Sequence, residues 1–172
     1  WLELGALPSP RADHISYFDG ARLFVFGGIG RDAATVQSFN TTTGSWSNWK
    51  NPMPVPVSAA AFAKRGDELI FAGGIDGRGR PVHAVQAFNI KTGKWRTLPN
   101  LPLAVSGGAL AVIDGDLHFA GGFSPAKSQV LKSHNKLVGQ RWQRQGELPG
   151  GGRHRMAYYG NDALFVLIGG AI

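Results

Sequence analysis

A pair of glycines recurs four times along this 172-residue chain, each time at the end of a short apolar run. The pairs are Gly27-Gly28, Gly73-Gly74, Gly121-Gly122 and Gly169-Gly170, at intervals of 46, 48 and 48 residues. A tryptophan precedes each pair by 26 or 27 residues, at Trp1, Trp46, Trp95 and Trp142. Two independent markers with one period indicate an internal repeat. Because a chain of this length supports one core, the repeat predicts a single domain, or part of one, built from copies of one small unit.

Each unit has the pattern of four short antiparallel strands. A run of small residues reaches a turn at Asp19-Gly20, Gly66-Asp67, Asp114-Gly115 or Asn161-Asp162, and a second run then ends in Gly-Gly. Such dipeptides supply the positive φ of tight hairpins. A third strand (TVQSFN, AVQAFN) turns into a fourth that opens with tryptophan. In the third unit SHN replaces AFN, which places His134 where Phe39 and Phe88 stand.

These residues resemble the kelch repeat family. The shared features are a hydrophobic strand closed by Gly-Gly, an aromatic residue in the third strand, a glycine before a tryptophan, and Leu-Pro-x-x-Arg linkers, which here read LPSPR, MPVPV, LPLAV and LPGGGR. The resemblance covers the whole chain and extends weakly to kelch-type sialic acid mutarotases of bacteria. It implies an all-β fold, a β-propeller of four-stranded antiparallel blades. The glycine pairs and the repeat tryptophans are then structural.

The expected units are residues 1–4 (a fourth strand), 13–52, 58–99, 106–147 and 154–172 (two strands), so three blades are complete. Small residues such as Ala60 and Gly108 in the first strands suit a crowded propeller axis. The start at Trp1 and the unfinished last blade predict an excised piece of a longer propeller or a ring that a second chain completes. A closed four-blade ring ranks third.

The net charge is +7, and it is uneven along the chain. Residues 87–172 carry ten Lys and Arg against four Asp and Glu, whereas residues 1–86 are nearly balanced. A basic half attracts anionic partners, but no dense cationic run is present and the aromatic residues belong to the core, so we expect no nucleic-acid partner. No apolar run is long enough to span a membrane. The absence of cysteine leaves the compartment open; the sequence is compatible with a soluble bacterial periplasmic or secreted protein.

Two glycine-rich segments could bind small anions. Residues 28–33 match the G-x-G-x-x-A dinucleotide pattern, but no helical period and no acidic residue about twenty positions later support it, so we predict no cofactor. The loop at residues 74–80 offers Arg78 and Arg80 as anion ligands, although a solvated turn is the favoured explanation of its glycines.

The main candidate site lies where innermost strands begin. Ligand-binding candidates are Arg11 and His14 in the first unit and Arg153 and Arg155 in the last, and Asp13 and His154 are the catalytic candidates. Both groups approach one mouth of the propeller channel, where they would form a cationic pocket if the two units were neighbours. The alternative is that Arg11 and Arg153 bond strand-end carbonyls.

Other chemistry has little support in the sequence. The five histidines, which include His118 and His134, show no metal-type spacing, so we predict no metal site and expect these two to be packed imidazoles. No nucleophile elbow and no cysteine are present. The favoured function is a non-enzymatic binding module whose loops and channel mouth take a protein or glycan. The alternative is a sugar mutarotase, in which Asp13 or His154 would act as acid or base beside an arginine.

Overall fold

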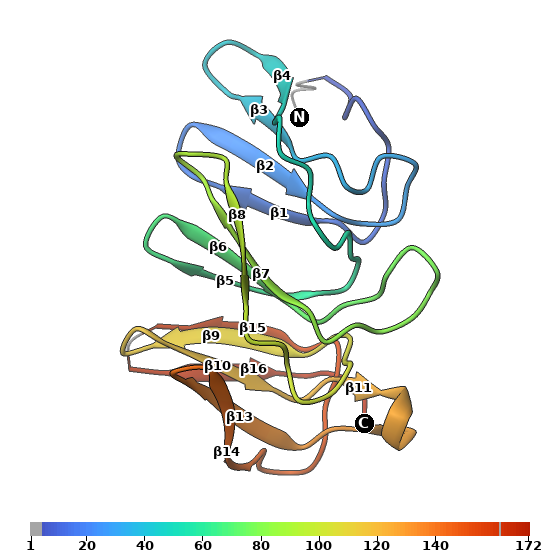
Figure 1. Ribbon diagram of the computed structural model, residues 1–172, viewed down its shortest axis with the longest axis vertical. Helices are drawn as coiled ribbons and strands as arrows, with labels where there is room; N and C mark the ends of the chain where they lie inside the picture. Colours follow the sequence, from blue (N-terminus) through green and yellow to red (C-terminus); the bar gives the residue numbers. More distant parts are fainter. Residues whose placement is uncertain (1–4, 162) are drawn as a thin grey trace.

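The computed structural model describes residues 5–161 and 163–172, and over these residues the regular secondary structure is β-strand apart from one short 3₁₀ turn. Three four-stranded antiparallel sheets and the two-stranded sheet at residues 157–168 follow one another along the chain, and the four-stranded sheets stack face to face (Figure 1). This arrangement confirms the all-β fold of four-stranded kelch blades. The expected strand at residues 1–4, with Trp1, lies outside the described residues, as does Asp162.

The sheets are numbered as blades in chain order. Blade 1 contains β1 (Ile15–Phe18), β2 (Arg22–Phe26), β3 (Gln37–Asn40) and β4 (Ser45–Asn48); blade 2 contains β5 (Ala61–Arg65), β6 (Glu68–Ala72), β7 (Val85–Asn89) and β8 (Trp95–Leu98). Blade 3 contains β9 (Ala109–Ile113), β10 (Asp116–Ala120), β13 (Ser133–Val138) and β14 (Arg141–Glu147), and blade 4 contains β15 (Ala157–Gly160) and β16 (Phe165–Ile168). Each sheet is ordered by increasing strand number.

Neighbouring blades meet along their first strands. β5 packs against β9, and β9 packs against β15. The hydroxyl of Tyr158 in β15 reaches past β9 to β5, where it donates to the carbonyl oxygen of Phe62 at 3.0 Å and accepts from its amide nitrogen at 2.6 Å. In Figure 1 blade 1 lies at the top, and β15 and β16 of blade 4 overlap β9 and β10 of blade 3. Ile168 of blade 4 is 65% exposed. That a second chain completes the ring stays a prediction.

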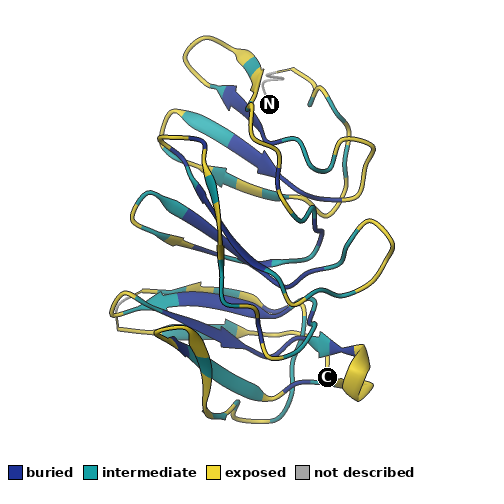
Figure 2. Ribbon diagram, in the orientation of Figure 1, coloured by how far each residue is buried: buried dark blue, intermediate teal, exposed yellow. Residues whose placement is uncertain are grey.

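The core lies between the faces of successive blades (Figure 2). Between blades 1 and 2 it is aromatic: Phe24 and Phe26 of blade 1 pack on Phe71 and Phe88 of blade 2. Between blades 2 and 3 it is mostly aliphatic and includes Ile70, Ala72, Leu110, Leu117 and Leu137. Blade 2 therefore buries one face on blade 1 and the other on blade 3, as propeller packing requires.

The Gly-Gly pairs join each blade to the linker that follows it. The second glycine donates its amide to a linker carbonyl: Gly28 to Val57 at 2.9 Å, Gly74 to Val105 at 2.8 Å and Gly122 to Arg153 at 2.8 Å. All eight glycines of the four pairs have positive φ, a conformation that residues with a Cβ adopt at a cost. The period of the sequence is thus the period of a repeated contact between the blade and its linker.

One sequence prediction is wrong, because His134 does not take the place of Phe39 and Phe88. Those phenylalanines pair with Trp46 and Trp95, and the residue that pairs with Trp142 is Leu137. The third-to-fourth turn of blade 3 is two residues shorter than in blades 1 and 2, and a bulge follows His134. Counting back from the tryptophan therefore misplaces the aromatic position.

Blade 3 also contains a hairpin that the repeat pattern does not predict. β11 (Phe123–Ser124) and β12 (Gln129–Val130) pair across the 3₁₀ turn η1 (Pro125–Lys127) in the loop between β10 and β13. Ser128 closes the turn in the left-handed conformation, with φ 49°. Within the described residues, no helix has the length and apolar character needed to cross a bilayer.

Candidate functional site: the loop face

Linkers and second-to-third-strand loops gather at one end of every blade, which we call the loop face. It comprises the loops at residues 27–36, 73–84 and 121–132 and the linkers at residues 5–14, 49–60, 99–108 and 148–156. Single β-bridges join each linker to the loop of its own blade, as between Ala12 and Ile29 and between Ser106 and Phe123. Because a rigid stack holds these segments side by side, ligand-binding loops from several repeats converge there.

Arg11 is held inside blade 1. Its guanidinium donates to the carbonyl oxygens of Gly27 at 3.2 Å and Thr35 at 3.0 Å, and to Oε1 of Gln37 at 3.1 Å. Burial of the guanidinium lowers the pKa of Arg11, and the charge of Asp32 opposes the shift. Most donors of Arg11 are therefore used on the blade itself, whereas Asp13 and His14 are exposed at the start of the same first strand.

A small pocket lies on the loop face, between the loops of blades 2 and 3 and the start of blade 4. We call it the channel-mouth pocket, because the sequence predicts the mouth of the propeller channel at this end of the blades. Its cavity volume is about 280 Å³. The lining residues are Ala59, Ile75, Gly79, Pro81, Ser106, Gly107, Phe123, Pro125, His154 and Arg155. The rings of His154 and Phe123 are 6.2 Å apart. The pocket combines an exposed cation, an imidazole, an aromatic ring and two prolines.

A chain of backbone hydrogen bonds forms the rigid edge of this channel-mouth pocket. The amide of Gly107 donates to Ala59 at 3.0 Å, and the amide of Arg155 donates to Gly107 at 2.7 Å. Ala59, Gly107 and Arg155 all have left-handed φ, as does Asp13, and they occupy the same repeat position. Left-handed backbone at non-glycine residues is costly and persists where the surrounding structure imposes it.

The predicted site residues are only partly brought together. His154 and Arg155 line the channel-mouth pocket, but Arg153 points elsewhere, donating to the carbonyl oxygen of Gly169 at 3.1 Å. Arg153 lines a cavity of about 670 Å³ between blades 3 and 4. Arg11, Asp13 and His14 belong to blade 1, at the other end of the stack.

The loop at residues 74–80 is organised around Asp76. Its carboxylate accepts from the backbone amides of Arg78 and Arg80, both at 2.9 Å, and from the Arg80 guanidinium at 2.9 Å. These hydrogen bonds, that of the Arg80 amide above all, lower the pKa of Asp76. Arg80 is thus engaged within its own loop, and both arginines are exposed.

Two histidines form a contact that sequence reasoning did not find. Nδ1 of His118 lies 2.8 Å from Nε2 of His134, and their rings stack with centroids 5.1 Å apart. In blade 2 the same strand positions hold Ile70 and Val85, so the pair replaces apolar contacts between blades. Phe165 of blade 4 packs against His134 at 6.2 Å. Among the described residues, no three metal-ligating side chains gather.

The histidine pair is expected to make folding stability depend on pH. Burial lowers the pKa of both imidazoles, and mutual repulsion adds to the shift at His118. The two imidazoles therefore bind protons more readily in the unfolded chain than in the folded one. The full stability is present above the unfolded pKa of about 6.5 and is lost as the pH falls below it. The charge of Lys136 opposes protonation of His118, and the charge of Asp116 favours it. Beside His134, the charged residues Glu147 and Arg153 line the same cavity.

Urea unfolding at about pH 7.5 and about pH 5.5 measures this effect, since carboxylates titrate at lower pH. The double variant His118→Ile with His134→Val carries the residues of blade 2 and is expected to flatten the dependence. An equal loss of stability in the variant and the wild type would rule out the pair as its source.

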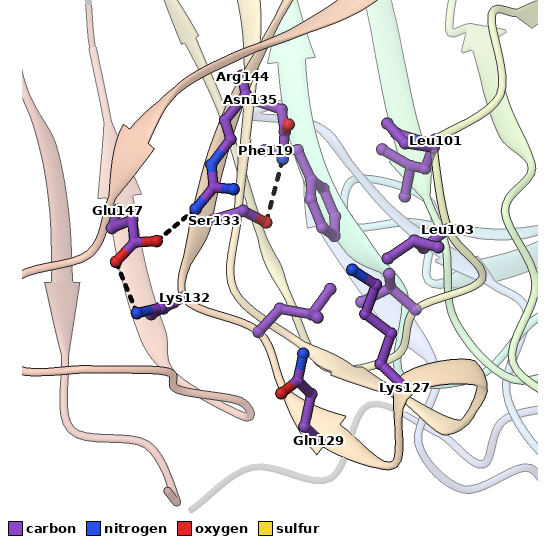
Figure 3. Close-up of a pocket in the computed structure, with 13 residues that line it drawn as sticks. Leu101, Leu103, Phe119, Lys127, Gln129, Lys132, Ser133, Asn135, Arg144 and Glu147 are labelled. Carbon is purple, nitrogen blue, oxygen red and sulfur yellow. Dashed lines mark hydrogen bonds and ion pairs between the residues drawn. The ribbon is translucent and has the colours of Figure 1, made fainter.

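A second pocket lies between blade 3 and the linker that joins it to blade 2, and we call it the interblade pocket (Figure 3). Its cavity volume is about 330 Å³. Its apolar side comes from the blade 3 linker, β10 and the segment after β12: Leu101, Leu103, Val105, Phe119 and Leu131. Its polar side carries Lys127, Gln129, Lys132, Ser133, Asn135, Arg144 and Glu147.

Comparisons with known proteins agree with this architecture. The family model described as "Kelch motif" matches residues 58–102. The "Kelch-like protein terF" of Aspergillus terreus is 33% identical over 189 residues, which cover 98% of this chain and 41% of the relative. The solved structure titled "Structure of YjhT" superposes with a TM-score of 0.81 at 19% identity, over 95% of this chain and 63% of that one.

Stacked four-stranded blades, joined through Gly-Gly pairs to their linkers, define the class of β-propeller repeat proteins. Within that class the chain belongs to the kelch repeat family. It spans about two fifths of the length of the curated relative and under two thirds of the solved neighbour.

Proposed function

We propose that the chain is a non-enzymatic binding module that takes an anionic protein segment or an acidic glycan on its loop face. The channel-mouth pocket is the observation that supports this function. Loops from blades 2 and 3 and the linker of blade 4 surround it, and Arg155 is exposed at its edge. An arginine offers planar, charge-assisted hydrogen bonds that suit carboxylates and sulfates.

Rigidity favours binding at this position. The hydrogen-bond chain from Ala59 through Gly107 to Arg155 holds the backbone before a partner arrives, so little ordering is required on association. Phe123, at the start of the β11–β12 hairpin, adds an aromatic face beside His154. Aromatic and arginine side chains are the residue types that most often dominate binding interfaces.

The test measures binding of an acidic glycan array and of an immobilised poly-glutamate peptide at low and high salt. The wild type is expected to bind at least one probe, and Arg155→Ala should weaken that binding about tenfold. Arg141→Ala is the matched control, because it removes an equal charge from an exposed position at the start of β14, outside the loop face. Absence of binding to every probe at low salt would refute the binding function. An equal loss of affinity in the two variants would refute the site.

The mutarotase alternative requires an acid or base beside a sugar-binding cation. His154 and Arg155 meet this requirement at the channel mouth, whereas Asp13 lies on blade 1, outside that pocket. Proton NMR of sialic acid anomers, recorded with wild type and with Arg155→Ala, tests it directly. Wild-type rates equal to the blank would remove this alternative and leave the binding function.

A further inference from the structure

One buried position of the third strand differs in blade 3 from its counterparts in blades 1 and 2. Gln37, Gln86 and Asn135 are equivalent, since they pair across the sheet with Val25, Phe71 and Phe119 of the second strands. Both glutamines are almost completely buried, with 0% and 2% exposure, whereas Asn135 is half-buried. The position faces the preceding blade.

The glutamines fill the space between blade and linker. Gln37 accepts from Arg11, the arginine of the LPSPR linker, and donates to Asn48 at 3.0 Å. In blade 2 the linker arginine is replaced by Val57, and Gln86 bonds to the linker backbone: its amide donates to the oxygen of Val55 at 2.6 Å and accepts from the nitrogen of Val55 at 3.1 Å. Buried amides must be paired in this way.

Blade 3 has neither the linker arginine nor the buried glutamine. Val105 stands at the linker arginine position, and Asn135 is one methylene shorter than glutamine. The amide of Asn135 bonds to Oγ of Ser133 at 3.3 Å instead of reaching Leu103, the counterpart of Val55. The interblade pocket occupies the space that these groups leave.

The charged rim of this pocket is positive. Glu147 pairs with Lys132 at 2.7 Å and also with Arg144, so one carboxylate is shared by two cations. Within the described part of the chain, Lys127 has no ion-pair partner. In Figure 3 its amine and the amide of Gln129 point toward the middle of the cavity. The opposite wall is formed by Leu103 and Phe119.

We infer that the interblade pocket binds a small organic carboxylate with an apolar body. The apolar body would lie on Leu103, Phe119 and Leu131, and the carboxylate would accept hydrogen bonds from Lys127 and Gln129. A volume of about 330 Å³ is at the lower end of ligand pockets and suits a small molecule. The site is separate from the channel mouth, so it goes beyond the proposed function.

The probe for this site is 3-phenylpropionate, with the neutral 3-phenylpropionamide as its matched control, titrated into the chain by isothermal calorimetry and NMR. The acid is expected to bind with saturation and at least about fivefold more tightly than the amide, because the rim has an unpaired cation. Absence of binding at about 10 mM acid, or equal affinity for acid and amide, would overturn the inference.

Variants locate the binding within the molecule. Lys127→Gln should lower the affinity for the acid about tenfold and leave the affinity for the amide unchanged. Lys94→Gln should change neither affinity, because Lys94 is an exposed lysine of the third-to-fourth turn in blade 2. Asn135→Gln restores the residue of blade 2 and should reduce the affinity for both probes while thermal stability is maintained. Unchanged affinity in Lys127→Gln or in folded Asn135→Gln would refute the site. Arg155→Ala should leave this binding intact, which separates it from the channel-mouth site.

Discussion

Replacing Gly73 with alanine is expected to lower the free energy of unfolding by about 3 kcal/mol. Gly73 has φ of +65°, where a side chain costs about 1–2 kcal/mol, and its added methyl group would overlap the carbonyl oxygen of Val105. That carbonyl accepts the amide of Gly74, so relief of the overlap would break the contact between blade 2 and the next linker.

Gly66→Ala separates the two causes. Gly66 has a similar φ of +58°, but nothing lies within 4 Å of its added methyl group. The Gly66→Ala variant should lose about 1 kcal/mol of unfolding free energy, from backbone strain alone. Urea unfolding of the two variants measures the difference, and equal losses would show that the close approach to the linker carries no cost.

Replacing Phe88 with alanine is expected to cost about 4 kcal/mol, because the ring is fully buried at the centre of the aromatic cluster between blades 1 and 2. Its centroid lies 5.3 Å from that of Phe26, 5.4 Å from that of Trp49 and 5.0 Å from that of Trp95. Truncation would leave a cavity in a region that packing holds rigid.

Two further variants refine this prediction. Phe88→Leu places in blade 2 the residue that blade 3 has at Leu137, and we expect it to cost about 1.5 kcal/mol. Phe18→Ala removes a ring that is 52% exposed and should change stability by less than about 0.5 kcal/mol. A similar loss in Phe18→Ala and Phe88→Ala, measured by thermal or urea unfolding, would contradict the central role of the cluster.

Much of the fold was predictable because its determinants are local and repeated. Turns such as Gly66-Asp67 and Asp114-Gly115 form where the dipeptides predict them, with Gly66, Asp114 and Gly115 at positive φ. The same signals failed in blade 3 between residues 121 and 142, where the loop holds an extra hairpin and the following turn is shorter. A period cannot reveal an insertion balanced by a deletion.

The candidate site was predictable only in part. The sequence placed Arg153 and Arg155 together, as two positions apart in a strand would share a face. The left-handed backbone at Arg155, with φ 55°, interrupts the extended segment, and Arg153 lines a cavity between blades whereas Arg155 lines the channel-mouth pocket. The interblade pocket depends on the space that the short side chains of Asn135 and Val105 leave open. This space is visible only when the two positions are known to face one another.

The sequence by itself determined the repeat, the strand order within each blade and the positions of the Gly-Gly contacts, because periodic apolar runs and turn residues act over a few neighbouring positions. Only the tertiary structure decided the register of β13, the pairing of His118 with His134, and the two pockets of the loop face. These features arise between strands and linkers that are distant along the chain, and the packing of whole blades sets the spaces in which their side chains meet.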